Sequence, residues 1–571
     1  MKEFANPFEH DAAANLPEDV IEEVYIEDHN FSRFILSNRN IYLLGERGSG
    51  KSMMFIYNSF RLYAKRKMGA DYDYVGIHVQ CKRALFNKPE HELLDNKDLA
   101  GAVSEHYLVL VVLDSIANAM QESESVNGEI NAQEFYSDFE YLTGDSLPQK
   151  NNVFDSLRMY AQKSINKVEM SGSAIESTRD NITFHTFHSL IVPVLELLRS
   201  TSQLKKAHFM LMIDDAHDLN DYQIRKINSW VAYRDNSVFS IKVATANVYR
   251  HSMQTEFGGH IVDGHDFMSI NMEKSFQNSQ SSFYRLAKEI VERRLRMFDI
   301  PRTAEEFFPE SEAFTTELER CRVSSRAKYI ESKPDASGKQ ISDQVYKDHR
   351  VEYFRSRSAK ANRPPYSGFE ILVATSTGVI RNLLSPCFSM YDTAVSENKS
   401  APNEIQAPIQ TEILMKKSDA LWTRLRECKL ADELIYCTEK QAREIHNLFE
   451  GLGDLFTDRL KSHKSEPRVL TFTVSGMTDE YRDRLDPILS VARRAQLLYE
   501  RSGPSKDSGR RETFYSPNRL LWIARGLDPV GQHGRASIPA KDLCAALDGR
   551  PLTNSDQLVQ PDLLDGCSFD D

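Results

Sequence analysis

One eight-residue segment near the start of the chain constrains the fold more than any other. Residues 45–52 read GERGSGKS, which fits the pattern G-x-x-x-x-G-K-[ST] of a phosphate-binding loop. The apolar run IYLL at 41–44 precedes this loop and predicts a buried strand, and residues 51–67 predict a helix with basic residues at its end. A strand, a glycine-rich loop and a helix in this order indicate an α/β fold.

The residue types of this loop suit the binding of a nucleotide. Glycines let consecutive backbone N–H groups turn toward phosphate oxygens, and the following helix directs its positive end at the same anion. We expect Lys51 to lie against the β- and γ-phosphates and Ser52 to ligate Mg²⁺, so the predicted cofactors are ATP and Mg²⁺. The alternative is a glycine-rich turn that caps a helix. The predicted nucleotide-binding residues of the loop are Gly45, Glu46, Arg47, Gly48, Ser49, Gly50, Lys51 and Ser52.

A second segment places two acids at the end of a predicted strand. Residues 209–220 read FMLMIDDAHDLN. We expect Asp214 to lie beside the loop as a Mg²⁺ ligand, and Asp215 to face the γ-phosphate and polarise a water, which makes Asp215 and Lys51 catalytic candidates. A buried strand that ends in Asp is common, so this interpretation depends on the first motif.

Two further polar residues are candidates for contacting the nucleotide or the water. The segment VATAN ends at Asn247, which could orient the attacking water, with Thr245 as the second choice; Asn247 could equally cap a helix or turn. Arg381 lies in a predicted helical region and could contact the γ-phosphate, or it could belong to a solvated helix face.

The pattern around these motifs predicts a parallel sheet. Strands at 74–80, 208–213 and 239–246 alternate with helices, as in α/β folds with a parallel sheet. Lys51 and Asp214 are much further apart than two βα units require, so we expect a helical insertion at about 81–182. Within it, the polar stretch 121–152 predicts loops.

The second half of the chain predicts a different architecture. Residues 281–396 are mostly helical, with a charged break at 331–365. A later order of helix, strand, helix and hairpin, at 438–524, is that of a winged-helix module. Six cations there are candidate DNA contacts, against the alternative of a solvated flexible loop. They are Arg493 and Arg494 on the second helix, and Arg501, Lys506, Arg510 and Arg511 in the loop at the expected wing tip.

Composition excludes several classes of protein. The net charge is −12, but residues 1–30 carry −8 and residues 551–571 carry −5, so the body between them is nearly neutral and shows no overall basic footprint. Seven scattered cysteines without a C-x-x-C pair argue against a zinc site or a disulfide framework. The apolar runs are too short for a membrane span and no secretory signal is present, so we expect a cytoplasmic protein.

Taken in order, these motifs resemble those of AAA+ ATPases, and in particular the origin-recognition initiator clade, whose members join an AAA+ core to a C-terminal winged helix. GERGSGKS resembles Walker A, MLMIDDAHDLN Walker B, VATAN sensor 1 and GVIRNLL sensor 2. The resemblance implies that Arg381 contacts the nucleotide and that Gln80 falls where the family has a polar switch residue. The predicted domains are an acidic segment 1–30, an α/β core 31–280, a helical lid 281–400, a winged-helix-like domain 410–550 and an acidic tail 551–571.

Two departures from the family pattern bear on function. Asp215 stands where the family usually has Glu, which predicts slow hydrolysis or a nucleotide-gated switch. The segment expected to supply an arginine finger to a neighbouring subunit holds only Arg250 and Lys274 as basic residues. The first hypothesis is an ATP-hydrolysing switch that acts on DNA. The alternatives are the ATPase of a multi-protein bacterial system such as phage defence, which gates partner proteins, and a non-hydrolysing scaffold; a homo-oligomer is compatible with each.

Overall fold

The computed structural model forms two compact units. One consists of Ala12–Glu273 and is called here the α/β unit; the other consists of Met1–Asp11 with Lys274–Asp571 and is called the helical unit. The structure describes residues 5–10, 12–27, 29–67, 71–81, 97–171, 183–233, 238–246, 252–272, 281–357, 364–434, 436–462, 467–504, 511–531, 534–552 and 558–559.

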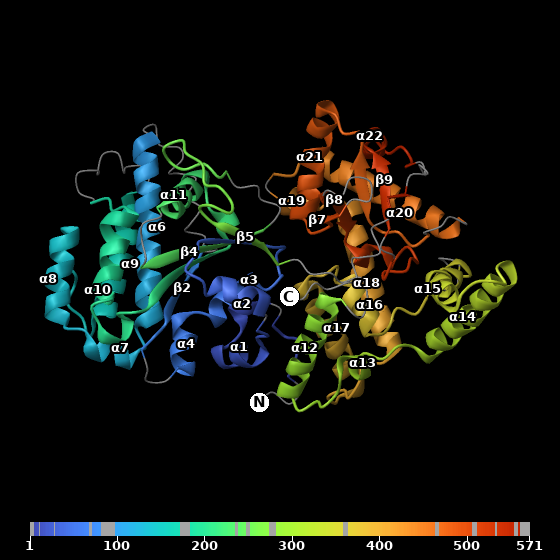
Figure 1. The fold of residues 1–571 in the computed structure, drawn as a ribbon, viewed down its shortest axis with the longest axis horizontal. Helices are drawn as coiled ribbons and strands as arrows, with labels where there is room; N and C mark the ends of the chain where they lie inside the picture. Colours follow the sequence, from blue (N-terminus) through green and yellow to red (C-terminus); the bar gives the residue numbers. More distant parts are fainter. Residues whose placement is uncertain are drawn as a thin grey trace. The chain divides into compact units, whose positions relative to one another are not determined.

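The α/β unit is built on a five-stranded sheet in the order β2-β3-β4-β1-β5 (Figure 1). Every neighbouring pair is parallel, so the predicted parallel sheet is confirmed. The register pairs Leu44 with Thr245 and Gln80 with Asp214, so these strands end at one edge. The strands are β1 (Ile41–Leu44), β2 (Tyr74–Gln80), β3 (His208–Asp214), β4 (Phe239–Thr245) and β5 (Met268–Asn271).

Alternating residues of the strands enter two separate cores. In β3, Met210 and Met212 pack in one core, and Phe209, Leu211 and Ile213 pack in the other, as the two-residue period of a strand requires. The methionine side is covered by α1 (Glu18–Val24), α2 (His29–Ile35) and α3 (Lys51–Tyr57). The other side is covered by α4 (Phe60–Arg66), α6 (Lys97–Met120), α10 (Val192–Leu198) and α11 (Asp221–Ala232). The unit is therefore a three-layer α/β/α sandwich.

Two local expectations for this unit were wrong. The helix predicted at 51–67 divides into α3 and α4 around Asn58. Gly76 of β2 explains the break, since a Cβ there would lie 2.0 Å from the carbonyl oxygen of Asn58, so the two backbones pack directly. The stretch 121–152, predicted as loops, is largely helical. It holds α7 (Glu124–Glu129) and α8 (Ala132–Thr143), and α9 (Val153–Ser171) follows and runs beside α6 (Figure 1).

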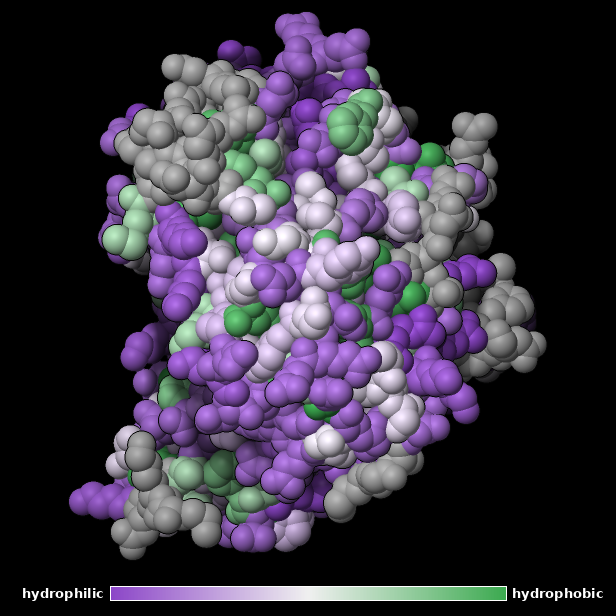
Figure 2. Space-filling model, turned by 90° about the vertical axis from the view of Figure 1, so that its left-hand side faces the viewer, coloured by the Kyte–Doolittle hydropathy of each residue, from purple (hydrophilic) through white to green (hydrophobic). Residues whose placement is uncertain are grey.

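The insertion buries many of its apolar residues within the fold, although Tyr141, Leu142 and Met170 are exposed. Among the described residues, Asp98–Met120 is long and apolar enough to cross a membrane, but 89% of its apolar window is buried inside the unit. Phe135 and Phe139 of α8 are also buried. The outward surface around α8 is mostly hydrophilic, with hydrophobic residues in small groups (Figure 2). The insertion is thus a covering layer of the sheet.

The helical unit begins with the N-terminal residues, where the Phe8 ring lies 6.4 Å from that of Phe307 and 6.1 Å from that of Phe308. The charged break predicted at 331–365 was wrong, because a helix occupies most of it and pairs with the helix before it. The first helices of the unit are α12 (Ser282–Met297), α13 (Ala304–Phe307), α14 (Glu312–Ser332), α15 (Gly338–Arg355), α16 (Phe369–Thr375) and α17 (Ile380–Asn398).

The end of the chain contains the predicted order of helix, strand, helix and hairpin, and adds elements to it. A second sheet has the order β10-β9-β6-β8-β7, of which β7, β9 and β10 were not predicted; residues 498–500 of β7 were expected in the preceding helix. Its strands are β6 (Phe472–Ser475), β7 (Leu498–Pro504), β8 (Arg511–Pro517), β9 (Arg535–Pro539) and β10 (Leu558–Val559). The helices are α18 (Ala407–Arg426), α19 (Leu430–Glu433), α20 (Glu439–Lys461), α21 (Asp479–Arg494) and α22 (Ala540–Leu547).

Candidate nucleotide site

The glycine-rich loop connects β1 to α3 and wraps around the Lys51 ammonium group. Gly48 and Gly50 have φ angles of 84° and 100°, which side chains with a Cβ rarely adopt. Lys51 is buried, and its Nζ donates to the carbonyl oxygens of Gly45 at 2.8 Å and Glu46 at 3.0 Å. The two glycines are therefore needed for the loop to close around the lysine.

Asp214, at the end of β3, meets this loop. Ser52 lies close enough to the Asp214 carboxylate to lower its pKa, and His78 Nε2 lies 3.1 Å from Asp214 Oδ2. Burial raises the pKa of Asp214, but the hydrogen bonds from His78 and Ser52 and the charge of Lys51 outweigh it, so the pKa lies below its ordinary value. A buried carboxylate that stays ionised beside a loop hydroxyl is a ligand pair that suits Mg²⁺.

The carboxylates around Lys51 help it to keep its positive charge despite burial. Burial lowers the pKa of Lys51 to about 8, and the charges of Asp214, Asp215 and Glu46 oppose this shift. Lys51 therefore stays cationic at neutral pH. Within the described residues, no group of three or more His, Cys, Asp or Glu side chains could hold a metal ion.

Asp215 occupies a backbone conformation unusual for a residue with a side chain. Its φ is 52°, in the left-handed region, and its N–H donates to Asp214 Oδ1 at 2.9 Å. The turn that follows contacts the glycine-rich loop, because the Arg47 guanidinium lies 2.8 Å from His217 Nε2 and 3.3 Å from Asp218 Oδ1. Arg47 thus connects the loop to the turn after β3 and is half-exposed in this position.

Only some of the other predicted nucleotide contacts lie within the described residues. β4 lies between β1 and β3 and ends in the buried Thr245, next to Leu44. Asn247 lies outside the described residues, as do Arg250 and Lys274. Arg381 lies in the first turn of α17 and belongs to the helical unit, so its phosphate contact stays a prediction.

The six cations predicted to contact DNA differ in their positions: some are bonded within the fold, one is exposed, and two lie outside the described residues. Arg501 was placed wrongly in the wing-tip loop: it lies inside β7, and its Nη2 donates to the carbonyl oxygen of Thr377 at 2.7 Å. Arg493 pairs with Glu500 at 2.6 Å, and Arg494 lies over the Tyr436 ring at 6.0 Å. Of the remaining cations, Arg511 is the exposed first residue of β8, and Lys506 and Arg510 lie outside the described residues.

Two histidines of the site were missed from the sequence. His78 contacts Asp214, and His217 contacts Arg47. His78 was open to prediction, since it lies two residues before Gln80 and therefore on the same face of β2. His217 gave no such signal, because its contact with Arg47 depends on the turn after β3.

A phosphate loop at the end of β1, an acidic end to β3 and the order β2-β3-β4-β1-β5 define a P-loop protein of the AAA+ class. The family model described as ORC-CDC6-like matches residues 6–538, and the chain belongs to this family. No curated protein matches the chain. The predicted resemblance to the initiator clade and the predicted α/β fold class are thereby confirmed.

Two archaeal structures are similar to the chain at low identity. The Cdc6p structure from Pyrobaculum aerophilum has 10% identity and a TM-score of 0.29, with 95% of this chain and 96% of that chain covered. The Orc1 protein of Aeropyrum pernix, in complex with DNA, has 9% identity and a TM-score of 0.30, with 92% and 96% covered. The assignment to the family depends on the family model alone, because both TM-scores are low.

Proposed function

We propose that the protein binds Mg²⁺-ATP in the loop at residues 45–52 and hydrolyses it slowly, as a nucleotide-gated switch. The observation that carries this proposal is the position of the ionised Asp214, at the end of β3, beside Ser52 and the buried Lys51. The family supports nucleotide binding in general terms.

Each residue has a distinct role in this proposal. The backbone N–H groups of the loop and the Lys51 ammonium would hold the β- and γ-phosphates, and Ser52 and Asp214 would hold Mg²⁺, which supplies charge neutralisation at the phosphates. Asp215 would accept a proton from the attacking water. Its carboxylate is one methylene shorter in reach than the Glu usual in the family, which makes slow turnover the expected result.

Substitution of Lys51 tests the proposal. Lys51→Ala should abolish ATP binding measured by isothermal titration in the presence of Mg²⁺, because the loop loses its only lysine. Lys206→Ala, an exposed lysine of the same unit, is the matched control and should bind ATP as the unaltered protein does. ATP binding by Lys51→Ala with unchanged affinity would show that the site is assigned wrongly.

We further propose that the nucleotide state controls DNA binding by the C-terminal region. The order of α20, β6, α21 and the β7–β8 hairpin supports a winged-helix-like module. Its hairpin loop carries Lys506 and Arg510 and is followed by the exposed Arg511. Cations at a wing tip suit contacts with a phosphate backbone. In this proposal, Arg501 is a structural residue of β7.

A salt titration tests the DNA proposal. Replacement of Lys506, Arg510 and Arg511 by Ala should weaken DNA binding and flatten its dependence on salt, because fewer counterions are released on binding. Replacement of Arg320, Arg322 and Arg326, which lie on α14, is the matched control and should change neither. If the unaltered protein shows no salt-dependent affinity for DNA, the switch acts on partner proteins and this second proposal is wrong.

A further inference from the structure

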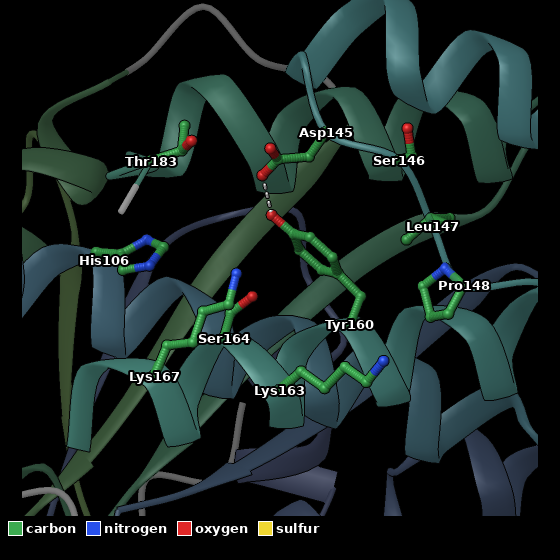
Figure 3. A pocket seen from close by; sticks show the side chains of 10 residues that line it. All are labelled: His106, Asp145, Ser146, Leu147, Pro148, Tyr160, Lys163, Ser164, Lys167 and Thr183. Atoms are coloured by element: carbon green, nitrogen blue, oxygen red, sulfur yellow. Dashed lines mark hydrogen bonds between the residues drawn. The ribbon is translucent and has the colours of Figure 1, made fainter. Parts of the chain in front are cut away.

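A pocket of about 360 Å³ lies in the insertion of the α/β unit, apart from the glycine-rich loop. It is formed by α6, the segment after α8, α9 and the residue at 183 (Figure 3). This volume is at the lower end of the range of small-molecule sites. The pocket is lined by His106, Asp145, Ser146, Leu147, Pro148, Tyr160, Lys163, Ser164, Lys167 and Thr183.

The one carboxylate of the pocket is already bonded by the protein's own groups. The Tyr160 hydroxyl donates to Asp145 Oδ2 at 2.5 Å (Figure 3). His185 Nε2 lies 2.8 Å from the same oxygen. Burial raises the pKa of Asp145, but these two hydrogen bonds lower it below its ordinary value. Asp145 therefore stays ionised, and its hydrogen bonds to Tyr160 and His185 hold the carboxylate in place at one side of the pocket.

His106 supplies a buried donor to the pocket. Its Nδ1 accepts the backbone N–H of His185 at 3.0 Å, so the proton of the neutral ring lies on Nε2. Burial, with a smaller effect of His185, lowers the pKa of His106 to about 3, which keeps the ring neutral. Within the described residues, no acceptor for this Nε2–H is recorded, although the side chain is only 2% exposed.

Two lysines and three hydroxyl groups complete the lining. Lys163 and Lys167 are four residues apart on α9, so they lie on one face of that helix, and both extend from it beside the pocket (Figure 3). Ser164 and Thr183 add hydroxyl groups, the Ser146 hydroxyl donates to Glu140 Oε1 at 2.8 Å, and Leu147 and Pro148 provide an apolar wall. Donors and positive charge therefore exceed the single, already bonded carboxylate.

We infer that this pocket binds a small molecule that carries a phosphate group. Ammonium and hydroxyl groups suit the tetrahedral oxygens of phosphate, whereas a planar carboxylate is matched best by the fork of an arginine, which this lining lacks. The apolar wall and the volume leave space for an uncharged part of about the size of a nucleoside. The site is independent of the glycine-rich loop, since none of its lining residues belongs to that loop.

Isothermal titration with two probes, AMP and inorganic phosphate, tests this site. The full-length protein carries Lys51→Ala in every arm, so that the glycine-rich loop does not contribute. AMP should bind with one site per chain, and Lys163→Met with Lys167→Met should lower its affinity at least tenfold. Lys150→Met, an exposed lysine on the segment before α9, is the matched control and should leave the affinity unchanged.

The comparison of the two probes identifies the source of the phosphate. Tighter binding of AMP supports a phosphate ester as the ligand, and equal binding of both probes supports the free anion. Both lysines are exposed, so the melting temperature of the double variant should equal that of the control. The inference is wrong if neither probe binds, or if the double variant binds AMP as tightly as the control does.

Discussion

Each unit of the protein buries an aspartate, and the two aspartates have different partners. Asp528 of the helical unit accepts two hydrogen bonds from Arg350, both at 2.9 Å, and one from Arg468 at 2.7 Å. Asp214 of the α/β unit is held by a hydroxyl, an imidazole and a backbone N–H. Both carboxylates have lowered pKa values, although burial opposes this in each.

The different partners of the two aspartates indicate different roles. Asp528 holds segments of the helical unit together, whereas Asp214 is the candidate for contact with a bound ligand. The two arginines that hold Asp528 are themselves buried; Arg350 lies on α15, Arg468 precedes β6, and Asp528 lies between β8 and β9, so the cluster joins these three segments. Removal of one member of such a cluster leaves the others without compensation. The partners of Asp214 among the described residues include no buried arginine, and they lie at the ends of the strands next to Lys51, where the proposed Mg²⁺ would bind. Substitutions of these two aspartates and of their neighbours test the difference in role.

Asp528→Asn should lower the free energy of unfolding by about 3–5 kcal/mol, because it leaves two buried guanidinium groups without their counter-charge. Urea denaturation of the full chain measures this loss. Asp214→Asn should cost far less, since no arginine depends on it among the described residues. Equal losses in the two variants would show that the comparison is mistaken.

Asp215→Asn should retain ATP affinity but lower turnover by about a hundredfold or more, because the amide cannot accept the proton of the attacking water. Phosphate release and ATP titration measure the two quantities separately. Asp221→Asn, an exposed acid at the start of α11, should change neither. Full turnover in Asp215→Asn would remove this residue from the mechanism.

His78→Ala should weaken the Mg²⁺-dependent part of ATP affinity by about tenfold, because the Asp214 carboxylate loses the group that orients it. Titrations with Mg²⁺ and with EDTA give this part by difference. His188→Ala, an exposed histidine of the same unit, serves as the control. If the loss is equal with and without Mg²⁺, His78 acts on the fold and not on the metal site.

Lys242 is a buried lysine on β4, and Lys242→Met tests how its loss of a proton on folding affects stability. Lys242 Nζ donates to the carbonyl oxygens of Ser37 at 2.5 Å and of Arg39, and burial lowers its pKa to about 7. Between this value and the unfolded value of 10.5, only the unfolded chain keeps the proton, so stability rises with pH. In Lys242→Met, the free energy of unfolding should no longer rise by roughly 1 kcal/mol per pH unit over this range. Unfolding at pH 7, 8 and 9 measures it, and an unchanged slope would contradict the assignment.

The sequence predicted the parallel sheet because apolar runs alternate with helices, and it predicted the loop because glycine and lysine spacing is local. It did not predict α7, α8 or the break at Asn58. Those depend on packing: α8 mixes polar and apolar residues and buries Phe135 and Phe139, and at the break Gly76 lets β2 approach the backbone of Asn58.

The sequence by itself determined which residues of the loop can surround a phosphate, since backbone conformation there follows from glycine at fixed positions. Which charged and polar groups lie near these loop residues followed only from the tertiary structure. His78 reaches Asp214 because two strands 136 residues apart pair in register, and Arg501 is held inside β7 by a carbonyl group far away in the chain. Contacts between distant segments set burial, and burial sets the energy of each charge.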